Sequence, residues 1–167
     1  NQDSILIFSS RNLGVGPIRT RLDLIAWNLS TRRLEWINKE AGPKGIGTLH
    51  IPLIYGEKVY LKDAEHITCF DPKNGDIIWQ SQPMMGHSQT PLLFADGKLI
   101  VNPDGREMYA LNPDNGQVLW HKSGMEAPAS ASHTLYHDGK LYSNGITDVV
   151  SKLHCIDPST GETIWTM

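Results

Sequence analysis

The sequence lacks the features that mark several special classes of protein. It has only 2 cysteines in 167 residues, too few for a disulfide-stabilised scaffold. No apolar run approaches the roughly 18 residues that a membrane-spanning helix needs. Glycine (15) and proline (10) stay below the proportions found in low-complexity chains, and 40% apolar residues suffice for a core. A membrane span and a disordered chain are therefore excluded, and a globular protein is predicted.

An excess of positive charge and the common catalytic motifs are also missing. The 15 basic and 18 acidic side chains give a net charge of −3, which provides no basic footprint for nucleic acid. The sequence contains no G-x-S-x-G, H-E-x-x-H or C-x-x-C motif. We therefore expect neither nucleic-acid binding nor catalysis by a familiar nucleophile or metal motif.

An eleven-residue pattern recurs along the chain. It reads CFDPKNGDIIW at 69–79, ALNPDNGQVLW at 110–120 and CIDPSTGETIW at 155–165, with a decayed copy, AWNLSTRRLEW, at 26–36. Four of the 5 tryptophans end these copies and are spaced by 43, 41 and 45 residues. A fixed period in the range of 20 to 50 residues is typical of a repeat architecture.

A second repeated signal precedes the pattern. Residues 51–61, 90–102 and 134–142 each read as two short apolar strands joined by a glycine-containing turn. Together the two signals predict four antiparallel strands in about 42 residues, the content of a propeller blade. The fold class is therefore all-β, a β-propeller with about four blades at 1–39, 40–82, 83–124 and 125–167. Residues 3–7 align with 96–100, so the first blade is expected to lack its first strand.

The turn inside each pattern has a specific chemistry. An Asp or Asn that bonds the following backbone, a Pro that fixes φ, and a left-handed Gly close a tight turn. These glycines are Gly75, Gly116 and Gly161, while the first copy has Arg32 in this position. A non-glycine residue in the left-handed region costs on the order of 1 kcal/mol. The first turn is therefore predicted to be either strained or differently built.

The pattern resembles the tryptophan-docking motif of the pyrroloquinoline-quinone-like (PQQ-like) β-propeller repeats. The resemblance implies that the strand-ending tryptophan packs between neighbouring blades and that a small residue makes room for it. The implied docking tryptophans are Trp36, Trp79, Trp120 and Trp165, with Ala26, Cys69, Ala110 and Cys155 as their small partners. By the same phase, Trp27 corresponds to Phe70, Leu111 and Ile156 and is interpreted as packing between blades.

The resemblance also carries expectations about context. Rings in this family mostly have seven or eight blades, so this chain is expected to be part of a larger ring. The rest of a parent chain or a second copy would complete that ring. The family includes quinoprotein dehydrogenases, an outer-membrane-assembly scaffold and sensor domains, which implies a periplasmic or extracellular location.

The two cysteines occupy the same phase of the second and fourth repeats. One blade lies between them, which disfavours a disulfide because the bond needs Cα atoms within about 7 Å. A metal site with His66 and His154 is one interpretation, and a small buried residue in place of alanine is the favoured one. The adjacent cysteines and calcium ligands of the quinoprotein dehydrogenases are not evident, so we expect no metal and no cofactor.

Candidate binding residues gather in the loops opposite the repeated turns. Those turns are nearly identical, whereas the connections from fourth to first strand and from second to third strand differ between blades. The predicted ligand-binding residues are His50, His87, Gln89, Ser132 and Arg106. An arginine offers a planar fork for carboxylate or phosphate groups, and a histidine makes binding pH-dependent near neutrality.

These features predict a non-catalytic scaffold that engages a protein, peptide or glycan through this loop face. Two alternatives remain open: a fragment of a quinoprotein dehydrogenase, or the sensor domain of a larger signalling protein. Nothing in the 167 residues distinguishes the scaffold from the sensor domain.

Overall fold

The fold is seen in a computed structural model. It describes residues 5–12, 21–39, 41, 51–63, 66–84, 90–103, 106–124, 134–146 and 151–167. The chain divides into two compact units, Asn1–Gln80 and Ser81–Met167. In the described part, all regular structure is β-strand, and no helix is long and apolar enough to cross a membrane.

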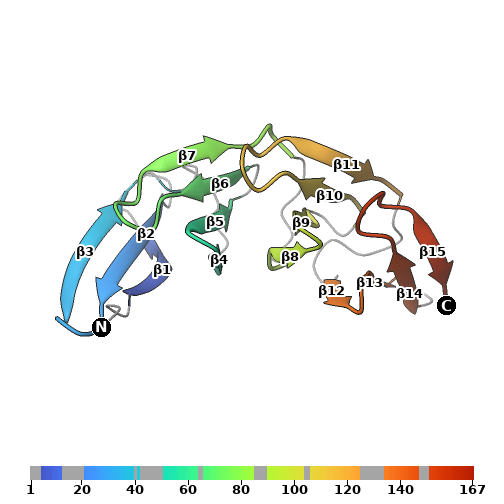
Figure 1. Cartoon of the computed structure of the whole chain (residues 1–167), viewed down its shortest axis with the longest axis horizontal. Helices are drawn as coiled ribbons and strands as arrows, with labels where there is room; N and C mark the ends of the chain where they lie inside the picture. Colours follow the sequence, from blue (N-terminus) through green and yellow to red (C-terminus); the bar gives the residue numbers. More distant parts are fainter. Residues whose placement is uncertain are drawn as a thin grey trace. The chain divides into compact units, whose positions relative to one another are not determined.

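The first unit contains two antiparallel sheets (Figure 1). Sheet one has the order β1-β2-β3 and sheet two the order β4-β5-β6-β7. The strands are β1 (Ile5–Asn12), β2 (Arg21–Asn28), β3 (Arg33–Asn38), β4 (Leu53–Tyr55), β5 (Lys58–Lys62), β6 (Ile67–Phe70) and β7 (Ile77–Gln80). Among the described residues, sheet one thus has three strands, as the alignment of residues 3–7 with 96–100 predicts.

The second unit contains two four-stranded antiparallel sheets. Sheet three runs β8-β9-β10-β11 and sheet four runs β12-β13-β14-β15. The strands are β8 (Leu93–Ala95), β9 (Lys98–Val101), β10 (Met108–Leu111), β11 (Val118–Lys122), β12 (Thr134–His137), β13 (Lys140–Ile146), β14 (Ser151–Ile156) and β15 (Thr163–Thr166). The prediction of an all-β propeller built from antiparallel blades is confirmed.

The strand register places a small residue directly opposite each repeated tryptophan. The four cross-strand pairs are Ala26 with Trp36, Cys69 with Trp79, Ala110 with Trp120, and Cys155 with Trp165. A register shift follows the small residue in every sheet. Both cysteines are free thiols and fully buried. Their size therefore accounts for their position, because they stand where the other two sheets have alanine.

Each unit contains one tryptophan that docks onto the turn of its next sheet. The indole Nε1 of Trp36 donates a hydrogen bond to the carbonyl oxygen of Pro72 at 2.9 Å. The indole Nε1 of Trp120 donates to the carbonyl oxygen of Pro158 at 2.8 Å. Since a buried indole N–H needs an acceptor, the bond fixes the tryptophan and the turn together.

The receiving turns adopt the predicted conformation. In sheet two the Gly75 N–H donates to the Asp71 carbonyl at 2.8 Å, and the Lys73 N–H donates to the Asp71 carboxylate at 2.8 Å. Gly75 and Gly161 have φ values of +77° and +76°. Arg32 has a φ of 56°, so the first turn keeps this left-handed shape without a glycine. Of the two options for this turn, the strained one is the one adopted.

Both docked tryptophans belong to hydrophobic clusters. In the first unit, Ile7 and Trp36 pack against a buried set formed by Leu24, Ala41, Val59, Leu61 and Phe70. In the second unit, Trp120 is itself buried, with Ala95, Ile100, Met108, Ala110, Leu141 and Ile156. The core of each unit therefore lies between its two sheets, where the docked tryptophan contacts residues of both.

The docking geometry predicts unequal effects of tryptophan replacement. Trp120 is 9% exposed whereas Trp165 is 40% exposed. Trp120→Ala should lower the free energy of unfolding by about 3 to 5 kcal/mol, as for other large-to-small core changes. Trp36→Ala should cost less, and Trp165→Ala least, because more of each ring already contacts water. Denaturant melts of the three variants provide the measurement, and equal losses would contradict a docking role.

The glycine beneath the Trp120 ring should tolerate substitution less well than a glycine in an open turn. A Cβ on Gly161 would stand 2.6 Å from a Trp120 ring carbon, whereas a Cβ on Gly139 would meet nothing within 4 Å. The two glycines have similar φ values, +76° and +71°. Gly139→Ala should therefore cost about 1 kcal/mol of backbone strain alone. Gly161→Ala should cost about 1 to 3 kcal/mol more from overpacking, measured by thermal unfolding. Identical melting temperatures for the two variants would exclude a close approach of the ring.

Candidate functional site

Most of the predicted ligand residues cannot be placed. His50, His87, Gln89 and Ser132 lie outside the described residues. Arg106 is described: it is exposed, on the connection that leads from β9 into β10. Of the five predicted ligand residues, the structure therefore describes Arg106, together with the ends of the strands beside it.

A cluster of side chains on sheet three lies next to Arg106 in the sequence. The Nε2 atom of His121 is in direct contact with the carboxylate of Glu107. The His121 ring stacks on the ring of Tyr109, with centroids 4.2 Å apart and planes at 9°. His121 is 43% exposed and Glu107 25%. We call Arg106, Glu107, Tyr109 and His121 the sheet-three patch.

The strand register explains how the patch forms and why sequence reasoning missed it. His121 follows the repeated Trp120 directly, and β11 continues past it to Lys122, so that His121 pairs with Tyr109. The imidazole is thus held on a sheet rather than on a loop. The sequence does contain a signal for this pair. The residue that follows each repeated tryptophan lies opposite the residue that precedes the small partner of that tryptophan, as His121 lies opposite Tyr109.

The same register position carries different chemistry in each sheet. It holds Ile25 with Ile37, Thr68 with Gln80, Tyr109 with His121, and His154 with Thr166. The Gln80 Nε2 donates to the Thr68 hydroxyl at 3.1 Å, and His154 Nδ1 lies 3.0 Å from the Thr166 hydroxyl. The register position next to the tryptophan pair therefore varies in all four sheets, and in sheet three it carries the stacked rings of the patch.

The connection between β5 and β6 has a structural role. The Asp63 carboxylate accepts a hydrogen bond from the His66 N–H at 2.7 Å, and the Asp63 N–H donates to the His66 carbonyl at 2.9 Å. Asp63 is only 5% exposed. Its carboxylate therefore stabilises the turn.

The opposite ends of the sheets are used for packing between blades. In the second unit, the Asp96 carboxylate accepts hydrogen bonds from Lys98 Nζ at 2.8 Å and from the Ser159 hydroxyl at 3.2 Å. The Lys98 hydrogen bond and charge, together with Ser159, hold the pKa of Asp96 below its usual value. This bridge joins the β8–β9 turn to the β14–β15 turn.

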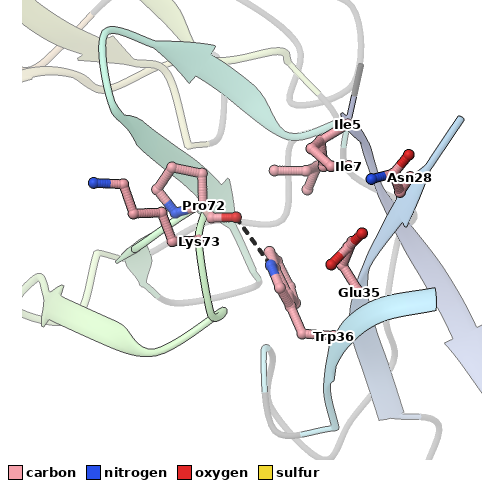
Figure 2. Close-up of a pocket in the computed structure, with 7 residues that line it drawn as sticks. All are labelled: Ile5, Ile7, Asn28, Glu35, Trp36, Pro72 and Lys73. Atoms are coloured by element: carbon pink, nitrogen blue, oxygen red, sulfur yellow. Dashed lines mark hydrogen bonds between the residues drawn. The ribbon is translucent and has the colours of Figure 1, made fainter. Parts of the chain in front are cut away.

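The first unit has a cavity at the corresponding place (Figure 2). Its volume is about 380 Å³. The lining residues are Ile5, Ile7, Asn28, Glu35, Trp36, Pro72 and Lys73. Figure 2 shows the Trp36 ring along one side, held by its bond to Pro72, with the Glu35 carboxylate beside it. Ile5 and Lys73 stand where sheets three and four have Lys98 and Ser159, so the bridge of the second unit has no counterpart made by these two residues.

The described residues offer no cluster of ligands for a calcium ion. They contain no group of three or more His, Cys, Asp or Glu side chains that could hold a metal ion. Calcium takes six to eight oxygen ligands. Asp63, Asp96 and Glu107 each already have a protein partner.

Comparisons with known proteins agree with the repeat geometry. Tetrathionate hydrolase from Acidithiobacillus ferrooxidans is 26% identical over 86% of this chain and 25% of its own length. The quinoprotein alcohol dehydrogenase PedH from Pseudomonas putida is 27% identical over 93% of this chain and 29% of its own length. The chain thus spans less than a third of either curated relative.

A solved structure shows the same fold at lower identity. The crystal structure of BamB from Moraxella catarrhalis superposes with a TM-score of 0.66 at 19% identity, covering 96% of this chain and 53% of that one. The family model described as outer membrane protein assembly factor BamB matches residues 9–133. With its register of small residues facing tryptophans and its indole-to-turn hydrogen bonds, the chain belongs to this family of PQQ-like β-propeller repeats.

Proposed function

We propose that this chain is a non-catalytic binding scaffold of the cell envelope that engages a protein partner at the loop face. The main support for this proposal is the contrast between the two ends of its sheets. The repeated turns are used in docking, through Pro72 and Pro158. The other end presents the sheet-three patch, in which Arg106 and His121 are exposed while Glu107 and Tyr109 are half-buried. The side chains of this patch are not repeated in the other sheets.

The chemistry of the patch suits a polypeptide ligand. The stacked Tyr109 and His121 rings bring aromatic groups to this end of sheet three, and the exposed His121 ring can pack against an apolar or aromatic side chain. Glu107 and His121 provide polar atoms beside it, and Arg106 adds a cationic group at its edge. Aromatic and arginine side chains are enriched among residues that dominate protein interfaces.

The family supports a protein partner and an envelope location. The family model that matches this chain is described as an outer membrane protein assembly factor. Such a factor, by its description, acts on other proteins. A glycan could use the same stacked rings and is kept as an outcome of the test. The alternative of a quinoprotein dehydrogenase fragment draws support from the PedH likeness, over 29% of that enzyme.

Binding can be tested with two probes and matched variants. The probes are an unfolded outer-membrane β-barrel polypeptide diluted from urea and a soluble peptidoglycan fragment, each measured by biolayer interferometry. Arg106→Ala and His121→Ala should each weaken polypeptide binding by roughly 5- to 30-fold, as for interface residues worth about 1 to 2 kcal/mol. A combined His50→Ala, His87→Ala, Gln89→Ala and Ser132→Ala variant should weaken it as well.

The control is Lys73→Ala, which removes an exposed cation from a docking turn. Binding and melting temperature should both stay close to those of the unchanged chain. Loss of binding on Lys73→Ala but not on Arg106→Ala would place the site at the other face. Binding of the glycan alone, dependent on His121, would replace the protein partner by a carbohydrate.

The dehydrogenase alternative predicts a different result. Isothermal titration of this chain with calcium, with and without pyrroloquinoline quinone, should show no binding at micromolar concentrations. The reason is that the described residues contain no group of three or more His, Cys, Asp or Glu side chains that could hold a metal ion, and that Asp63 and Glu107 already have protein partners. Micromolar or tighter binding would overturn the non-catalytic proposal and favour the enzyme.

A further inference from the structure

Sheet one exposes an apolar face that its counterparts bury. Leu6, Phe8 and Trp27 are 48%, 37% and 38% exposed. In sheet two the residues at the same register positions include Val59 and Phe70, both 0% exposed. In sheet four, Leu141 and Ile156 are also 0% exposed. We call Leu6, Phe8 and Trp27 the receiving face of sheet one.

The equivalent faces are covered by the preceding sheet of the same unit. Val59 and Phe70 belong to the cluster against which Trp36 packs. Leu141 and Ile156 belong to the cluster that contains Trp120. Two independent junctions therefore show what this kind of face binds, namely the tryptophan side of another blade.

The turn beside the receiving face is closed to a tryptophan. At both junctions the ring lies over the turn glycine, and an added Cβ would come within 2.5 Å of Trp36 or 2.6 Å of Trp120. In sheet one this position is Arg32, in the same left-handed conformation with φ 56°. Its Cβ therefore occupies the space in which the indole of a docking blade would lie.

We propose that the receiving face binds a propeller blade whose outer strand carries a small residue in place of the docking tryptophan, and that Arg32 excludes tryptophan-bearing blades. A small residue leaves a gap over the turn, which the Arg32 Cβ and aliphatic stem can fill. Sheet four of a second copy is then a poor partner, because it carries Trp165, which is 40% exposed. This inference concerns a blade-to-blade surface and goes beyond the proposed ligand-binding patch.

The turn of sheet one selects its partner by steric exclusion. Overpacking a ring against a backbone-linked carbon cannot be relieved by rotating a flexible side chain, so the contact is rejected. The apolar area of Leu6, Phe8 and Trp27 still favours burial. The same surface thus attracts a blade and selects against the commonest kind of blade in this chain.

A four-variant cycle tests the match between the two positions. The unchanged chain, Arg32→Gly, Trp165→Ala and the double variant are compared by sedimentation equilibrium over a range of concentrations. Arg32→Gly should self-associate more than about tenfold more tightly than the unchanged chain, because its turn admits Trp165. Trp165→Ala should also associate more tightly than the unchanged chain, since a small residue then faces Arg32. The double variant should associate less tightly than Arg32→Gly, because it no longer has the Trp165 ring that fills the opened turn.

The variant Arg32→Ala distinguishes the effect of the Arg32 Cβ from the effect of its charge. It keeps the carbon that excludes the ring and removes the guanidinium, so it should associate as weakly as the unchanged chain. Thermal melts confirm folding of each variant, and Arg32→Gly should be at least as stable because glycine adopts positive φ without strain. Equal association of Arg32→Ala and Arg32→Gly would overturn the steric argument. Tight, Trp165-dependent association of the unchanged chain would overturn the exclusion, and unchanged association of Trp165→Ala would overturn the tryptophan-free partner.

Discussion

The interaction on which this structure depends is the hydrogen bond from a strand-ending indole to the carbonyl of the next turn. It links Trp36 to Pro72 and Trp120 to Pro158. The bond requires a ring lying flat on the turn, which only a residue without a side chain allows at Gly75 and Gly161. Because an indole covers a large apolar area and has one donor, the same contact supplies both burial and direction. Each turn is thus folded by its own strands and held by its neighbour.

This division explains why the two ends of the sheets differ so much. The turn end must keep an Asp or Asn, a proline and a left-handed glycine, since each has a defined role in docking. The loop end has no such obligation, and there the register position beside the tryptophan changes from two isoleucines to a tyrosine–histidine stack. A repeat scaffold gains specificity in this way without altering the contacts that stabilise it.

The likeness to both an assembly factor and quinone enzymes follows from the same separation. The docking framework is compatible with either, because its indole hydrogen bonds go to the turns at one end of the sheets. The described carboxylates support this view, since Asp63 stabilises a turn and Asp96 bridges two turns. Under the proposed function, folding and ligand binding therefore use different residues of this chain.

The sequence by itself determined the repeat, the strand order of each blade and the turns, because these depend on local patterns of apolar alternation, proline and glycine. It also predicted that the first turn departs from the others, since Arg32 replaces the glycine of the pattern, and the structure showed that the left-handed shape is kept. Only the tertiary structure decided which side chains meet across strands. The contact of His121 with Glu107 and Tyr109 depends on a register and on a strand that extends one residue past His121, to Lys122. Register and burial arise from pairing and packing between distant segments, which local patterns do not encode.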